Sequence, residues 1–195
     1  MSGRGLILTL CLLLLSGCQQ WHTPTAKGWV MLDGGYYQLL DNWPGRPQQL
    51  LQQVSWRDEQ QQQQFVLNAL LTADSILLVA LSPIGQELWR LHYQPQHQLT
   101  LSGIAPFNQP EFAKRLLAEM QLALLDSTVI TPRLQGLALT EHATESGTER
   151  HISHASGKLI LQIHHSAQIS TAVPITLKAR HYQLQITTLQ QDFLP

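Results

Sequence analysis

The sequence has little charge and almost no cysteine. Only 13% of its 195 residues are charged, the formal net charge is −1, and Cys11 and Cys18 are the two cysteines. Lysine and arginine form no basic stripe, which argues against a nucleic-acid-binding surface. No apolar run reaches the roughly 20 residues that a membrane-spanning helix needs. Glutamine is abundant instead, so we expect the polar side chains on the surface to be mostly amides rather than charged groups.

Sequence signatures of catalysis and of metal binding are also absent. The chain has no Gly-x-Ser-x-Gly and no His-Glu-x-x-His motif. On a strand, a spacing of three places His151 and His154 on opposite faces, and the adjacent His164 and His165 diverge as well. We therefore expect solvated histidines, no metal, no cofactor and no enzymatic activity. A hydrolase assembled from residues far apart in the sequence remains a third alternative.

The N-terminus resembles the signal of bacterial lipoproteins. The apolar segment 6–15 follows Arg4 and is too short to span a bilayer, which is typical of a signal-peptide core. It runs into Leu15-Ser16-Gly17-Cys18, which resembles a lipobox. In that family the signal is cut before the cysteine, which then carries acyl chains such as palmitate. The resemblance implies a signal peptide over 1–17, lipidation of Cys18 and, with Gln19 next, the periplasmic face of the outer membrane. The alternative is an ordinary secretory signal with a chance cysteine.

Short apolar runs separated by glycine and proline predict successive antiparallel hairpins. Residues 18–47 hold several glycines and prolines, so we predict a lipidated tether with an irregular lead-in there, followed by a single domain over 48–195. The predicted strands cover 50–56, 64–71, 75–81, 86–93, 98–101, 150–154, 158–164, 175–179 and 182–189.

One segment, NQPEFAKRLLAEMQLALLD, has a helical period. We predict a helix over 109–125, with Asn108 and Glu111 as a capping box and Pro110 in the first turn. An apolar stripe marks the face that must be covered, namely Phe112, Leu116, Leu117, Met120, Ala123 and Leu124. The sequence thus predicts an α+β fold in which this helix packs against one face of a curved antiparallel sheet.

Two stretches, SILLVALSPIGQELWRL and VPITLKARHYQLQITTLQQDF, resemble the LolA/LolB superfamily of lipoprotein-handling proteins. The chain looks closest to an uncharacterised family of short proteobacterial outer-membrane lipoproteins that resemble LolB. This resemblance implies an unclosed half-barrel with a helical lid over an apolar cavity. It also implies that Ile84, between Pro83 and Gly85, is a membrane-inserting tip. The alternative is that Ile84 folds back on its own hairpin.

Strand and helix alternation gives the candidate cavity lining as Leu67, Leu77, Val79, Leu88, Leu91 and Leu116. On this interpretation the chain is a monomeric, membrane-anchored lipoprotein that binds or transfers a lipid, an acyl chain or a lipidated cargo. A structural or adaptor lipoprotein with a filled core, which docks to an envelope complex, remains the alternative. The volume of the interior separates them, because an acyl ligand needs an open cavity of several hundred Å³.

Overall fold

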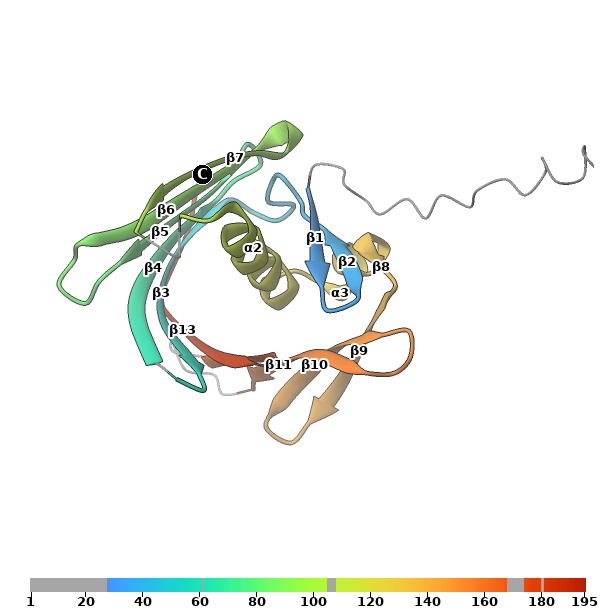
Figure 1. Cartoon of the computed structure of the whole chain (residues 1–195). Helices are drawn as coiled ribbons and strands as arrows, with labels where there is room; N and C mark the ends of the chain where they lie inside the picture. Colours follow the sequence, from blue (N-terminus) through green and yellow to red (C-terminus); the bar gives the residue numbers. More distant parts are fainter. Residues whose placement is uncertain (1–27, 61, 105–107, 168–173, 180) are drawn as a thin grey trace, which may run out of the picture.

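A single curved sheet of ten antiparallel strands dominates the structure, a computed structural model that describes residues 28–60, 62–104, 108–167, 174–179 and 181–195 (Figure 1). The strand order is β7-β6-β5-β4-β3-β13-β12-β11-β10-β9. The strands are β3 (Gln48–Asp58), β4 (Gln62–Leu71), β5 (Ile76–Leu81), β6 (Glu87–Gln94), β7 (Gln98–Gly103), β9 (Leu137–Thr144), β10 (Gly147–His154), β11 (Leu159–Ser166), β12 (Pro174–Ala179) and β13 (Tyr182–Phe193). In the described residues β7 and β9 do not pair with each other, so the sheet stays open.

Alternation of side chains explains why these segments form strands with one covered face. In β5, Ile76, Leu78 and Ala80 are fully buried, while the residues between them are partly exposed. The β5–β6 turn closes through hydrogen bonds from Gly85 N to Ser82 O and from Ser82 N to Gln86 O, both 2.8 Å. Gly85 has a φ of 83°, which an L-residue with a side chain adopts at a cost, so a glycine suits this position of the turn.

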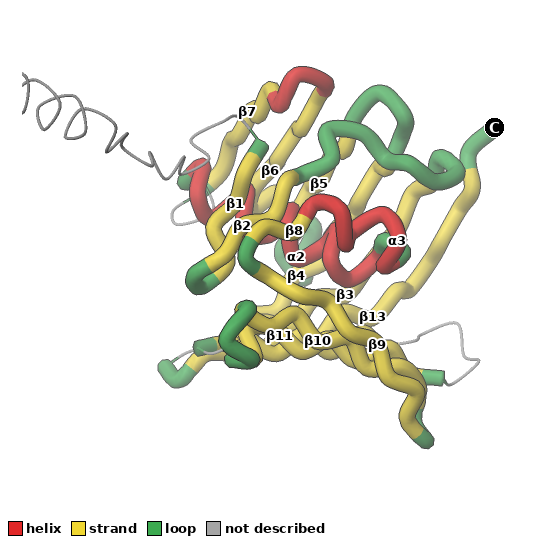
Figure 2. Tube along the Cα trace, turned by 90° about the vertical axis from the view of Figure 1, so that its right-hand side faces the viewer, coloured by secondary structure: helices red, strands yellow, loops and turns green. Residues whose placement is uncertain are grey.

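Helix α2 (Pro110–Leu124) lies in the concavity of the ten-stranded sheet. A second, three-stranded sheet covers its other side, made of β1 (Trp29–Leu32), β2 (Gly35–Gln38) and β8 (Leu134–Gln135). Figure 2 shows α2 and the short helix α3 (Ser127–Ile130) between β5–β7 on one side and β9–β11 on the other. Single turns of 3-10 helix precede β7 and β8, at Pro95–His97 and Thr131–Arg133. The predicted fold class, a curved unclosed antiparallel sheet with a helical lid, is confirmed.

Several local predictions are wrong. The irregular lead-in does not extend to residue 47, because β1 and β2 form a hairpin that packs on α2. Strand β9 was not predicted, since only Leu137 and Leu139 along it are more than slightly buried. Helix α2 begins after Gln109 with no side-chain capping bond, so the capping box of Asn108 is wrong, whereas Pro110 does stand in the first turn. Among the described residues no helix has the length and apolarity to cross a membrane.

Candidate functional site

The candidate site is a small apolar cavity between α2 and the concave face of the sheet. Its volume is about 20 Å³. All of its lining side chains except Gln52 and Glu119 are apolar, and they come from α2 and from strands of both halves of the sheet. The lining consists of Gln52, Val54, Phe65, Leu67, Leu78, Leu116, Glu119, Met120, Ala123, Leu124, Leu177, Leu184 and Ile186.

A buried carboxylate lies at one side of this cavity. Glu119 is 3% exposed and accepts a 2.7 Å hydrogen bond from Arg115 Nε, one turn earlier on α2. The hydroxyl of Tyr182, at the start of β13, donates to the same carboxylate oxygen. Burial raises the pKa of Glu119 above its usual value, although Arg115 opposes that effect. The cluster joins α2 to the sheet at a point where the lining is otherwise apolar.

A buried amide joins α2 to the small sheet on its other side. Gln121 is fully buried, and its Oε1 accepts hydrogen bonds from Tyr37 Oη at 3.1 Å and from Leu40 N at 3.0 Å. Its Nε2 donates to Leu40 O at 2.7 Å. Burial raises the pKa of the Tyr37 hydroxyl, so Tyr37 stays a neutral donor at physiological pH. Gln121 therefore provides hydrogen-bond partners for both backbone groups of Leu40, just after β2.

The C-terminal end of α2 is held by an arginine from β10. Arg150 is 6% exposed, and its Nη1 donates to Leu122 O and, at 2.8 Å, to Leu125 O. These carbonyls have no partner within the helix, and a cation there also complements the helix dipole. Arg150 also forms an ion pair with Glu141 of β9 at 2.7 Å. Burial opposes ionisation of Glu141, but hydrogen bonds from Arg150 and Ser127 hold its pKa below the usual value.

The arrangement can cover an apolar surface, but in this structure it does not leave room for a ligand. Sites for drug-sized ligands have volumes of roughly 300–1,000 Å³, far above the 20 Å³ found here. The space is filled by α2 itself, through Leu116, Met120, Ala123 and Leu124. A ligand could occupy the concave face only if α2 moved away from it.

Four of the six predicted lining residues lie on or near the core. Leu67 and Leu116 line the cavity, as predicted. Leu91 and Leu88 do not line it: Leu91 is fully buried elsewhere on β6, and Leu88 is half-buried at the margin of the core.

The placement of Leu77 and Val79 in the lining is wrong. Both are partly exposed on the face of β5 that points away from α2, while Leu78 between them lines the cavity. Because every residue in the run 76–81 is apolar, its composition does not tell the two faces apart.

Ile84 and Cys18 were predicted from the family resemblance. Ile84 is 89% exposed at the tip of the β5–β6 turn, so it does not fold back on its own hairpin. Its insertion into a membrane stays a prediction. Cys18 and the predicted signal peptide lie outside the described residues, and lipidation stays a prediction as well.

The polar members of the site did not stand out in the sequence. Glu119 and Gln121 lie outside the predicted apolar stripe of the helix, and no pattern indicated that Tyr182 of the large sheet reaches Glu119 or that a second sheet covers Gln121. The lining from β3 and β13 was also missed, although Gln52 and Val54 alternate with exposed residues as Leu184 and Ile186 do. That alternation indicates that one face of each strand is covered. Which face points toward α2 became clear only from the pairing of β3 with β13.

The chain belongs to the family described as a protein of unknown function, DUF3261, whose model matches residues 49–190. No curated protein matches the sequence. The matched range contains α2, α3 and all ten strands of the large sheet, except for the first residue of β3 and the last three residues of β13.

Solved structures with some similarity to this chain include two bacterial proteins. One is a LolA superfamily protein from Nitrosomonas europaea, with a TM-score of 0.42 and 6% identity over 79% of this chain and 89% of that chain. Another is a domain described as an outer membrane lipoprotein-sorting protein from Vibrio parahaemolyticus, with a TM-score of 0.36 and 9% identity over 77% of this chain and 87% of that chain.

Proposed function

We propose that this chain binds or transfers a lipid or a lipidated cargo at the surface of a bacterial membrane. The observation that carries the proposal is the largely apolar concave face of the sheet, covered by one helix that is tied down at separate polar points. An acyl chain could replace the side chains of α2 on that face if the helix moved away as a unit, and the contacts of α2 with Tyr182 and Arg150 of the large sheet would then be exchanged for contacts with water.

On this proposal the structure is the closed, ligand-free state. The chain is anchored by acylated Cys18 to the periplasmic face of the outer membrane and acts as a monomer. Ile84 is the point of contact with the membrane during transfer. Its exposed side chain would gain about 1.5–3 kcal/mol on burial in hydrocarbon, which gives the tip a preference for lipid over water.

A second candidate is a structural or adaptor lipoprotein that docks to an envelope complex. The nearly filled interior favours it, because a cavity of about 20 Å³ holds no more than about one water molecule. The two candidates differ in whether α2 ever leaves the concave face.

Ligand capture by variants of α2 separates the candidates. Met120 lines the cavity and is 6% exposed, so Met120→Ala would enlarge the space beneath the helix. Leu122 is fully buried on the same helix but does not line the cavity, so Leu122→Ala is a matched control with a similar loss of stability, about 2–5 kcal/mol.

The measurement is native mass spectrometry together with titration of a fluorescent C16 fatty acid. Lipid binding predicts acyl ligands on the native chain and a higher occupancy in Met120→Ala than in Leu122→Ala. Absence of any acyl ligand from the native chain and both variants would instead support the adaptor.

A further inference from the structure

The outer face of β9, β10 and β11 gathers histidines that are distant in the sequence. His142 on β9 is the direct cross-strand partner of Glu149 on β10. His151 follows Glu149 by two residues, so both side chains leave the same face of the strand. On the other side, His164 of β11 is the direct partner of Glu149. The face points away from α2, because Arg150 and Ile152 occupy the covered side.

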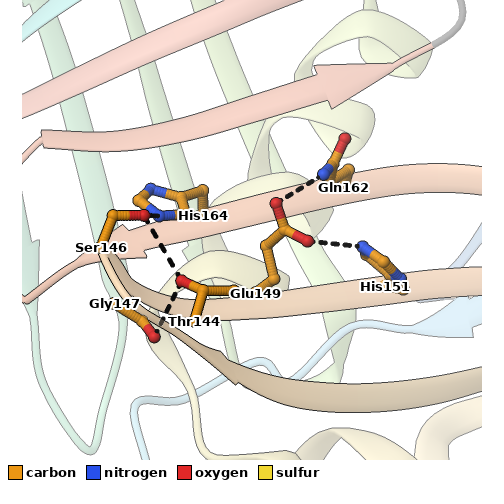
Figure 3. Close-up of polar contacts among 7 residues, drawn as sticks. All are labelled: Thr144, Ser146, Gly147, Glu149, His151, Gln162 and His164. Carbon is orange, nitrogen blue, oxygen red and sulfur yellow. Dashed lines mark hydrogen bonds and ion pairs between the residues drawn. The ribbon is translucent and has the colours of Figure 1, made fainter.

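The side chain of His151 contacts both Glu149 and His142. His151 Nε2 lies 3.2 Å from Glu149 Oε2, as Figure 3 shows. The rings of His142 and His151 are 5.6 Å apart between centroids, at an interplanar angle of 60°. Three potential ligands thus occupy one patch, contributed by positions i and i+2 of one strand and by the facing residue of the next.

A second hydrogen bond fixes the orientation of the Glu149 carboxylate. Glu149 Oε1 accepts a 2.7 Å hydrogen bond from Gln162 Nε2, which leaves Oε2 directed at His151 (Figure 3). Carboxylates that bind metals are commonly oriented by such a second hydrogen bond. His164 is engaged elsewhere, since its Nε2 lies 2.9 Å from Ser146 Oγ.

We propose that His142, Glu149 and His151 form a binding site for a divalent transition-metal ion such as zinc. Zinc binds imidazole nitrogen and carboxylate oxygen at roughly 2.0–2.2 Å, so two ligand atoms of a tetrahedral ion lie about 3.3 Å apart. Glu149 and His151 are hydrogen-bonded at 3.2 Å in the ion-free chain, a separation close to that spacing, so an ion could take the place of the shared proton with little movement of either side chain. A water molecule would complete the four ligands.

The third ligand has to turn toward the ion. Within the described residues, no three histidine, cysteine, aspartate or glutamate side chains converge as a metal site in this structure. His142 is exposed on the edge strand, so rotation about its side-chain bonds meets little resistance. A bound ion would join the edge strand β9 to β10 through side chains as well as through the backbone.

Zinc titration of the folded chain tests the site. Cys11→Ser and Cys18→Ser provide a background without thiols, no polyhistidine tag is used, and binding of zinc chloride is followed by calorimetry. One ion should bind, and the melting temperature should rise with zinc. His142→Ala, Glu149→Gln and His151→Ala should each weaken binding at least about tenfold, and Gln162→Ala should weaken it about 10–100-fold.

His154→Ala and His164→Ala are the matched controls. His154 lies on β10 with its side chain on the other face, and His164 adjoins Glu149 but belongs to the contact with Ser146. Both controls should bind zinc as the background does. The proposal is overturned if the background binds no more zinc than a triple variant without His142, Glu149 and His151. It is equally overturned if His164→Ala weakens binding as much as His142→Ala.

Discussion

Ile84 and Glu119 are two side chains whose surroundings oppose their chemistry. Ile84, a large aliphatic residue, is 89% exposed at a turn, and Glu119, a carboxylic acid on α2, is only 3% exposed. Each arrangement forgoes free energy in the closed state, because burial would stabilise the first side chain and hydration the second. The two positions therefore yield separate predictions.

Replacing Ile84 with glutamate should leave folding nearly unchanged, because exposed substitutions cost within about 0.5 kcal/mol. Transfer of a labelled lipid to liposomes should fall sharply, since a carboxylate enters hydrocarbon at a high cost. Ile84→Leu, which keeps the apolar bulk, should retain transfer. A thermal melt and a liposome assay on both variants provide the check. Normal transfer by Ile84→Glu would rule out a membrane-inserting tip.

Glu119 should make stability depend on pH in a defined direction. Its pKa is raised in the folded state, so the folded chain keeps the proton at pH values where the unfolded chain has lost it. The resulting stability is fully present below the unfolded value of about 4.5 and is lost as pH rises through the folded pKa.

Glu119→Gln mimics the protonated form and removes this dependence. The variant's melting temperature minus that of the native chain should increase as pH rises from about 4.5 toward 8. Glu141, whose pKa is lowered, has the opposite dependence, but it is present in both proteins and cancels in the difference. A difference that stays flat or decreases with pH would show that the Glu119 carboxylate is ionised at little cost.

At the scale of elements, the position of α2 depends on few polar contacts. Arg150→Met would remove the donors to Leu122 O and Leu125 O and leave Glu141 without its partner. Because each buried acceptor left unpaired costs about 1–3 kcal/mol, we expect a loss of roughly 2–5 kcal/mol in the free energy of unfolding, measured by urea denaturation.

Arg90→Met is the control for the arginine substitution. Arg90 pairs with Glu87 at 2.6 Å on the exposed side of β6, where water screens the attraction, so its loss should leave stability nearly unchanged. Equal effects of the two substitutions would contradict the role of Arg150 in holding the end of α2.

Elements with a strong local pattern were predictable. The helix and all the strands from β3 to β7 and from β10 to β13 follow from periodicity and from turn residues such as Pro83 and Gly85. The short strands β1, β2 and β8 and the exposed edge strand β9 carry little pattern of their own. Strand β8 depends on a partner distant in the sequence, since its Gln135 pairs with Tyr36 of β2. Strands β1 and β2 form a hairpin, as do β9 and β10, and the apolar residues of β1, β2 and β9 are too few to mark them as strands.

At the scale of the whole molecule, attachment to a membrane through Cys18 is a prediction from the lipobox resemblance. Cys18→Ala should leave the chain unlipidated and release it into the periplasm, because the acylated cysteine is the proposed anchor. Mass spectrometry and membrane fractionation of the native and variant chains check this. A variant that stays in the membrane fraction with an unchanged mass would contradict lipidation at Cys18.

The sequence by itself determined the features that depend on neighbours along the chain. Apolar alternation indicated a curved antiparallel sheet, a 3.6-residue period indicated the helix, and Pro83 and Gly85 indicated a turn around Ile84. The tertiary structure alone decided what depends on neighbours across space. It buried Glu119 between α2 and the large sheet and Gln121 between α2 and the small sheet, chose Leu78 over Leu77 as the inward side chain, and filled the cavity with the helix. It also set His142 opposite Glu149, because strand register is fixed by the pairing of whole strands and not by the spacing within any one of them.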